Sequence, residues 1–212
     1  MPPSELVKKK RSSGVASLRI PHKIRIGITG SPGTGKKTLG KLLSQALDEE
    51  LVLINDIAIK GGFGKRAGKV YNVEVNKLRG KIVTKNRIIA GHLLPYVIPD
   101  KDLDLVIVLR CSPTILRRRY ELRRYRKAKI RENLEAELIG LVASKCQQEY
   151  QSKKIAEFDT SRTTPESISQ RVLDIIIGRS KPSFGNIDWL SNLTAASLAR
   201  QLDGKYHTFN IP

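Results

Sequence analysis

The apolar positions near the start of the chain first alternate and then recur at helical spacing. Isoleucine occupies every second position from residue 24 to residue 28, and this alternation predicts a strand. From Leu39 to Leu47 apolar residues return three or four positions apart, which predicts a helix beginning at Lys36. Because a glycine-rich stretch separates the two patterns, we expect a strand, a tight loop and a helix in immediate succession.

Further along, short apolar runs alternate with helical patterns. We expect strands at residues 51–54, 87–90, 103–109 and 155–158, and a short extra strand within 70–75. We expect helices at residues 113–123, 128–151 and 165–177. The run at 103–109 is apolar nearly throughout, as in a strand covered on both faces. Strands that alternate with helices predict an α/β fold with a parallel sheet between two layers of helices.

Both ends of the chain differ in composition from the middle. Residues 1–23 contain the basic run Lys8 to Arg11 with little apolar periodicity, which predicts a flexible basic arm. Two interpretations of this arm stay open, a contact with RNA and a disordered tail. Residues 180–212 read as a linker followed by a short amphipathic helix from Asp188 to Leu202, with Trp189 on its apolar face. We expect that helix to dock on the central domain, residues 24–179, or on a partner.

The formal net charge of the 212 residues is +19, with 39 Lys and Arg against 20 Asp and Glu. Such an excess favours a polyanionic partner larger than a small nucleotide, with nucleic acid the leading candidate. A solvated basic surface and an acidic protein partner are the alternatives.

Cysteine use and hydropathy bear on the compartment. Cys111 and Cys146 lack C-x-x-C or metal-site spacing, which fits two small core residues in a reducing compartment. No apolar run has the length of a membrane span, and the amino terminus lacks the apolar stretch of a secretory signal. We therefore expect an intracellular, cytoplasmic protein without a membrane partner and without an intrinsic metal site.

The glycine-rich stretch Gly30 to Thr38 matches the pattern G-x-x-x-x-G-K of a nucleotide-phosphate loop. In such a loop the backbone N–H groups surround the phosphates, with close approach at Gly33 and Gly35, and Lys36 reaches the outer phosphates. The next position normally supplies a Ser or Thr hydroxyl to Mg²⁺, but here it is Lys37. An ammonium group cannot ligate a cation while protonated, so the motif predicts ATP binding with an altered metal position.

Several motifs together resemble the archaeal and eukaryotic adenylate kinase isoenzyme 6 family. They are the loop Gly-Ser-Pro-Gly-Thr-Gly-Lys, the strand end Gly91-His92, the stretch Val-Leu-Arg-Cys-Ser-Pro from Val108, and residues 129–137. The resemblance covers about residues 24–177. It implies a P-loop NTPase fold, a three-layer sandwich with a five-stranded parallel sheet. It also implies a nucleoside-monophosphate flap within about residues 56–79 and a short lid at about residues 123–133.

The resemblance also implies an activity and a set of site residues. Members of this family are small kinases that convert ATP and AMP to two ADP and are linked to maturation of the small ribosomal subunit. In the family an arginine at the place of Arg123 contacts ATP and closes the lid, and the glycine that usually follows is Arg124 here. His92 matches a family histidine, for which a catalytic role near the nucleotide and a structural role both stay open. Asn55 and Asp56 follow a strand and are expected to bind the monophosphate.

Two departures from the family concern magnesium. Besides Lys37, Ala90 occupies the position where relatives carry an acidic residue associated with the metal and its water. Thr38 is an imperfect substitute, because its position normally faces the α-phosphate. We expect Mg²⁺ to be carried by ATP with its own waters, without protein ligands. Alternatively, the Lys37 ammonium itself neutralises the outer phosphates.

Three functions are compatible with the sequence. The first is an adenylate kinase with accompanying ATPase activity. The second is a nucleotide-binding assembly factor with weak catalysis that binds ribosomal RNA or a small-subunit ribosomal protein. The third is a metabolic kinase whose charge only adapts it to its surroundings.

Overall fold

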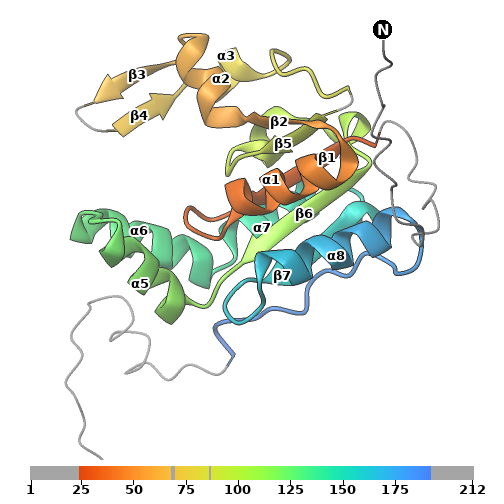
Figure 1. The fold of residues 1–212 in the computed structure, drawn as a ribbon. Coiled ribbons are helices and arrows are strands. Elements are labelled where there is room, and N and C mark those ends of the chain that lie inside the picture. Colours follow the sequence, from red (N-terminus) through yellow and green to blue (C-terminus); the bar gives the residue numbers. More distant parts are fainter. Residues whose placement is uncertain (1–23, 68–69, 86, 192–212) are drawn as a thin grey trace, which may run out of the picture.

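The computed structural model describes residues 24–67, 70–85 and 87–191. Five parallel strands form the main sheet in the order β2-β5-β1-β6-β7. Their bounds are β1 (Ile26–Gly30), β2 (Glu50–Leu53), β5 (Arg87–Ala90), β6 (Leu105–Arg110) and β7 (Ile155–Asp159). The predicted five-stranded parallel sheet is confirmed, and β1, which leads into the glycine-rich loop, lies at its centre (Figure 1).

Helices cover both faces of the sheet and produce three layers. On one face α1 (Lys36–Leu47) and α8 (Pro165–Ile176) pack on side chains such as Ile107 and Leu109. On the other face α4 (Leu94–Val97) and α7 (Leu141–Glu149) pack with Val106 and Val108. The alternation along β6 explains its continuous apolar run, because each face of this strand is buried against a different helical layer.

The segment between β2 and β5 forms a small unit beside the sheet and packs on its core through Ile54, Ala58 and Leu78. It contains α2 (Ile54–Lys60), the antiparallel hairpin β3 (Gly64–Ala67) and β4 (Val70–Val73), and α3 (Val75–Leu78). The expected extra strand within 70–75 is therefore present as β4. The expected strand at 51–54 ends one residue early, because Ile54 is already the first residue of α2.

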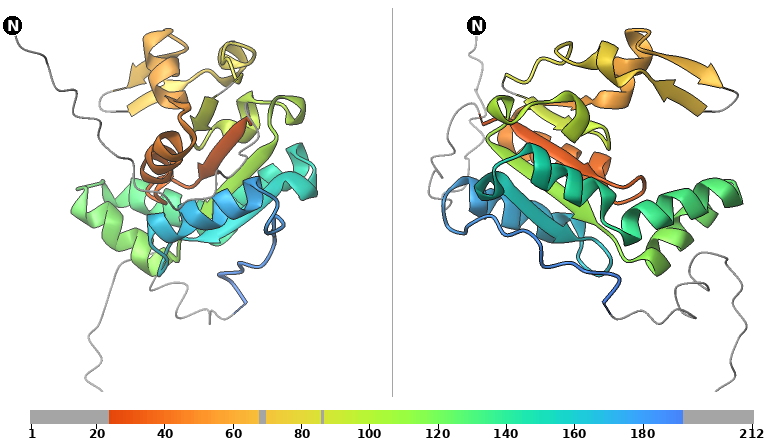
Figure 2. Two further views of the ribbon diagram at one scale, coloured as in Figure 1. Left: turned by 45° about the vertical axis from the view of Figure 1, so that its right-hand side comes forward. Right: turned by 180° about the vertical axis from the view of Figure 1, so that it is seen from behind.

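A pair of helices, α5 (Pro113–Leu122) and α6 (Lys127–Leu138), follows β6. This pair and the β3–β4 hairpin extend beyond the sheet on the same side (Figures 1 and 2). The single helix predicted at 128–151 is wrong. It is divided into α6 and α7 at Gly140, whose φ of 64° is the left-handed conformation that ends helices. Short 3₁₀ turns at Asp100–Asp102 and Ser152–Lys154 complete the described elements.

The C-terminal segment crosses the sheet edge without forming the start of the expected helix. Asp188 Oδ1 accepts hydrogen bonds from the backbone N–H groups of Leu190 and Ser191, which makes a turn. Trp189 docks on the central domain, but as part of this extended segment. The rest of the predicted helix and the basic arm, residues 192–202 and 1–23, lie outside the described residues. Among the helices described, none has the length and hydropathy needed to cross a membrane.

Candidate active site

The glycine-rich loop connects the end of β1 to the start of α1 at the carboxyl edge of the sheet. Gly30 has a φ of 132°, and a Cβ there would come within 2.1 Å of the Leu109 carbonyl oxygen on the neighbouring strand. Gly35 is the N-cap of α1 with a φ of 102°. The two glycines let the chain turn sharply, so that the amino-terminal end of α1 opens toward the loop, where it favours anions.

Lys36 lies over this loop. Its Nζ donates hydrogen bonds of 2.8 Å to the carbonyl oxygens of Gly30 and Ser31. Burial lowers the pKa of the Lys36 ammonium to about 7, with nearby Glu137 opposing that shift and Arg123 adding to it. A phosphate group bound in the loop would supply a neighbouring negative charge, which stabilises the protonated form of Lys36.

A cavity of about 790 Å³ opens beside the loop. Its walls come from the loop, the ends of β2 and β5, the first turn of α2 and the connection between α5 and α6. The predicted site residues that line it are Lys36, Lys37, Asn55, Asp56 and His92, together with Ala90. The structure therefore brings together, in one cavity, side chains from segments that are far apart in the sequence.

The charge of the cavity wall is strongly positive. The basic side chains that line it are Lys36, Lys37, Arg124, Arg126 and Lys129. Among its described lining residues, Asp56 is the single acidic one. This arrangement attracts a polyanion of the size of a nucleotide and repels a free divalent cation.

His92 lies in the same cavity and is mostly buried. Burial, together with the positive charges of Lys36 and Lys129, lowers the pKa of His92 to about 4. The imidazole is therefore neutral near pH 7, so it can donate and accept hydrogen bonds but does not add positive charge.

The predicted site residues Gly33, Gly35, Thr38 and Arg123 do not line this cavity. Thr38 is exposed on α1. Arg123, which caps α5, is exposed, yet its guanidinium lies against the loop, because a Cβ built on Gly33 would be 3.5 Å from one of its terminal nitrogens. Arg123 thus lies beside the loop, at the rim of the site.

Two residues of α5 contact the loop directly, and the sequence did not single them out. Arg119 donates to the Gly33 carbonyl oxygen at 3.1 Å and to the Thr160 carbonyl oxygen at 2.7 Å. Tyr120 donates its hydroxyl to the Pro32 carbonyl oxygen at 2.5 Å. Arg119 belongs to a dense basic run, in which nothing in the sequence distinguishes a residue that contacts the loop from its solvated neighbours.

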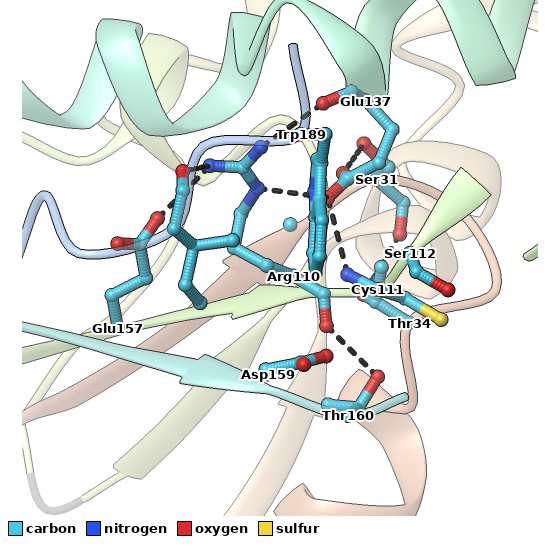
Figure 3. A network of polar contacts seen from close by, with 12 residues as sticks. Ser31, Thr34, Arg110, Cys111, Ser112, Glu137, Glu157, Asp159, Thr160 and Trp189 are labelled. Carbon is cyan, nitrogen blue, oxygen red and sulfur yellow. Dashed lines mark hydrogen bonds and ion pairs between the residues drawn. The ribbon is translucent and has the colours of Figure 1, made fainter. Parts of the chain in front are cut away.

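A buried carboxylate supports the loop from behind (Figure 3). Glu137 of α6, 1% exposed, accepts hydrogen bonds from Ser31 Oγ at 2.5 Å, Arg110 Nε at 2.8 Å, the Cys111 backbone N–H at 3.1 Å and Trp189 Nε1 at 3.0 Å. Four donors on one carboxylate hold the loop, strand β6, helix α6 and the C-terminal segment in one arrangement.

Arg110 extends this network toward the sheet edge (Figure 3). Its guanidinium also donates to Glu157 Oε1 on β7 at 3.0 Å and lies 5.9 Å from the centre of the Trp189 ring. The side chains of Arg110 and of both glutamates are at most 5% exposed. The buried charges are therefore paired, as they must be away from water.

Comparison with known proteins gives consistent results. A family model described as an AAA domain matches residues 26–140. A protein of Pyrococcus abyssi named "Putative adenylate kinase" is 36% identical over 168 residues, which are 77% of this chain and 90% of that protein. A protein of Thermococcus onnurineus with the same name is 32% identical over the same shares of the two chains.

Among solved structures, a shikimate kinase from Acinetobacter baumannii in complex with shikimate is 20% identical, with a TM-score of 0.49 over 74% of this chain and 95% of that one. The assignment to a family rests on the sequence relatives and on the matched domain, which covers the loop and the lining of the cavity. The chain belongs to the AAA-domain family and to the family of the archaeal proteins named putative adenylate kinase.

Proposed function

We propose that this protein is an adenylate kinase of the isoenzyme 6 type, which transfers the γ-phosphoryl group of ATP to AMP and yields two ADP. The observation that carries this proposal is the single cavity in which the loop residue Lys36 meets Asn55, Asp56 and His92. Phosphoryl transfer needs positioning and charge stabilisation more than covalent chemistry, and a basic cavity of this kind supplies both.

In this reaction the loop holds ATP and the far wall of the cavity holds AMP. An oxygen of the AMP phosphate forms a bond to the γ-phosphorus while the bond from that phosphorus to the β,γ-bridging oxygen breaks. Lys36 stabilises the charge that passes between the two nucleotides, and Asn55 and Asp56 orient AMP. Neutral His92 orients the attacking phosphate by hydrogen bonding.

The segments that flank the cavity are assigned as its moving parts. Residues 56–79, which include the β3–β4 hairpin, serve as the monophosphate flap, and residues 123–133 serve as the lid. Arg123 closes on the phosphates from its position beside Gly33. Charge stabilisation by a mobile arginine is a recurring feature of phosphoryl transfer.

The two positions at which the resemblance implies Mg²⁺ contacts offer no ligand in this chain. Lys37 and Ala90 place an ammonium and a methyl group in the cavity, and neither group is a ligand. Within the described part of the chain, no group of three or more His, Cys, Asp and Glu side chains could hold a metal ion. Magnesium therefore reaches the site on ATP, with its waters, and transfer is slower than in relatives that ligate the metal.

The test is turnover of ATP and AMP. Purified full-length protein with ATP, AMP and Mg²⁺ is expected to form ADP from both substrates, which labelled AMP would report directly. Lys36→Met is expected to abolish turnover, while Lys41→Met, an exposed lysine on the same helix, is expected to leave it unchanged. Binding of ATP without any conversion of AMP would refute the kinase proposal.

A second candidate is a nucleotide-binding assembly factor for the small ribosomal subunit, with weak catalysis. The observation that favours it is the set of exposed basic residues at the junction of α5 and α6, which exceeds what one nucleotide can use. They are Arg118, Arg123, Arg124, Arg126 and Lys127. Ribosomal RNA or an acidic surface of a small-subunit ribosomal protein would neutralise them.

Salt dependence tests this candidate. Affinity for a ribosomal RNA fragment is expected to fall steeply between low and moderate salt through counterion release. A variant with Arg118 and Lys127 changed to glutamine would reduce the slope while keeping ATP binding. Absence of RNA affinity at low salt, together with absence of co-sedimentation with ribosomal particles, would eliminate this role.

A further inference from the structure

Asn133 of α6 carries a buried donor without a partner. The residue is 5% exposed, and its Nδ2 has no hydrogen-bond partner among the described residues. A buried amide that lacks its hydrogen bond destabilises the fold, so such groups are rare in native proteins. Asn133 also lines the 790 Å³ cavity beside the loop. The unpartnered donor therefore belongs to a residue of the cavity wall.

The position of Asn133 on α6 places it next to the phosphate loop. Lys129, Asn133 and Glu137 are spaced four residues apart, so they form one row along the helix. Glu137 at the inner end of the row is bonded to Ser31 of the loop, and Lys129 at the outer end is at the cavity wall. Asn133 lies between them, facing a cavity that Pro32 and Lys36 of the loop also line.

The packing of Asn133 does not explain why an amide is present. Its helical neighbours Ile130 and Leu134 are buried in an apolar cluster, where a leucine at position 133 would be the ordinary choice. The other buried side-chain atom without a partner in the described residues is Thr29 Oγ1, and Thr29 does not line the cavity. Among the described residues Asn133 thus combines an unpartnered buried amide with a place in the cavity lining.

We propose that Asn133 Nδ2 donates a hydrogen bond to a phosphoryl oxygen of the bound nucleotide, so that Asn133 is a further phosphate-binding residue of this chain. This inference rests on the proposed nucleotide kinase function. The basic lining favours phosphate over the base as the group that Asn133 meets, because Lys36 and Lys129 flank the same part of the wall. The lysines attract phosphate by their charge, and the neutral amide of Asn133 adds a hydrogen bond of defined direction.

The test compares nucleotide affinity and stability in three variants. Asn133→Leu keeps the approximate volume but removes the donor, and Asn133→Asp keeps the shape while replacing the donor with a negative oxygen. Asn186→Leu is the matched control, since Asn186 is exposed on the C-terminal segment away from the cavity. Calorimetry would give the dissociation constants for ATP and ADP, and thermal unfolding would give the stability of each protein without nucleotide.

We expect Asn133→Leu to weaken ATP binding roughly 10- to 100-fold, the effect of losing one hydrogen bond to a charged group. Its nucleotide-free melting temperature should stay the same or rise, because the unpartnered donor is gone. Asn133→Asp should weaken ATP binding at least as much, and Asn186→Leu should bind like the wild type. A purely structural role would instead lower the melting temperature of Asn133→Leu without changing the affinity.

Two results would overturn the inference. One is wild-type affinity in both Asn133 variants; the other is retained affinity in Asn133→Asp with a loss in Asn133→Leu, which would make the side chain an acceptor. These results differ from failure of the proposed function, because that failure is measured in the wild-type protein, which would then convert no AMP even where it binds ATP.

Discussion

Ser31 in the phosphate loop donates its hydroxyl to Glu137 of helix α6 at 2.5 Å, although the two residues are 106 positions apart in the chain. The other carboxylate oxygen of Glu137 accepts from Arg110 and Trp189. Since α6 also carries Lys129 and Asn133 on the cavity wall, this contact sets where the basic wall lies relative to the loop. The shape of the cavity thus depends on Glu137, which lies behind the loop and does not line the cavity.

Replacement of Glu137 by glutamine is expected to destabilise the protein by about 3 kcal/mol or more, because a buried cation then loses a charged partner. In the glutamine variant an NH₂ donor would also replace one carboxylate oxygen, and it would face other donors instead of accepting from them. Urea unfolding measures the effect. Glu135→Gln, on the same helix but in an exposed pair with Arg131, is the control and should change stability by less than about 1 kcal/mol. Equal effects of the two substitutions would contradict the role assigned to Glu137.

The elements that the sequence predicted well are those formed by local patterns. The alternation in β1, the glycine loop and the spacing of apolar residues in α1 each involve neighbouring residues, so their periodicity is visible in the chain itself. The break at Gly140 was missed, because apolar residues continue at helical spacing on both sides of it. Gly140 has a left-handed φ and lies beside Arg110, whose terminal guanidinium nitrogens would be 3.5 Å from a Cβ at this position.

The site residues also fall into those that the order of elements predicts and those that only packing brings to the loop. Lys36, Lys37, Asn55, Asp56 and His92 follow strand ends or the loop, so the order of elements placed them at one edge of the sheet. Glu137 and Trp189 were not predicted as supports of the loop, because their mutual contact joins residues 52 positions apart and depends on packing alone. Trp189 was instead assigned to a helix by its apolar character.

Binding of ATP at pH 8 is expected to take up close to one proton. Lys36, with a pKa lowered to about 7 by burial, is mostly neutral at that pH in the free protein. The phosphates favour the charged ammonium and raise its pKa, so the complex binds a proton that the free protein lacks. Calorimetry in buffers with different ionisation enthalpies would measure the uptake.

The control for proton uptake is Lys41→Met, which changes an exposed lysine of the same helix outside the cavity and should leave the uptake unchanged. An uptake of zero in the wild-type protein at pH 8 would show that Lys36 is already charged before the nucleotide arrives.

Arg124 is strained in the connection between α5 and α6. Its φ of 55° is left-handed, a conformation that costs a residue with a Cβ about 1 kcal/mol and glycine almost nothing. We expect Arg124→Gly to leave stability unchanged or raise it slightly. Arg126→Gly is the matched control, because Arg126 has a φ of −65° and glycine relieves no left-handed strain there. Chemical unfolding should therefore rank Arg124→Gly about 1 kcal/mol above Arg126→Gly; the reverse order would show that the Arg124 side chain stabilises the junction.

The effect of Mg²⁺ on ATP affinity tests the roles of Lys37 and Ala90 in the cavity. The ammonium of Lys37 is expected to neutralise phosphate charge that a protein-bound cation would otherwise neutralise. Chelation of Mg²⁺ should therefore change the ATP affinity of the wild type only slightly. Lys37→Thr removes that charge and supplies a hydroxyl, and its ATP affinity should become dependent on Mg²⁺ by roughly tenfold, the equivalent of about 1.4 kcal/mol. Adding Ala90→Asp should raise both the metal dependence and the rate of transfer.

Lys41→Thr makes the same substitution outside the cavity and should keep the wild-type response. If neither the metal dependence nor turnover rises in the double variant, these two positions do not govern how the cation is held.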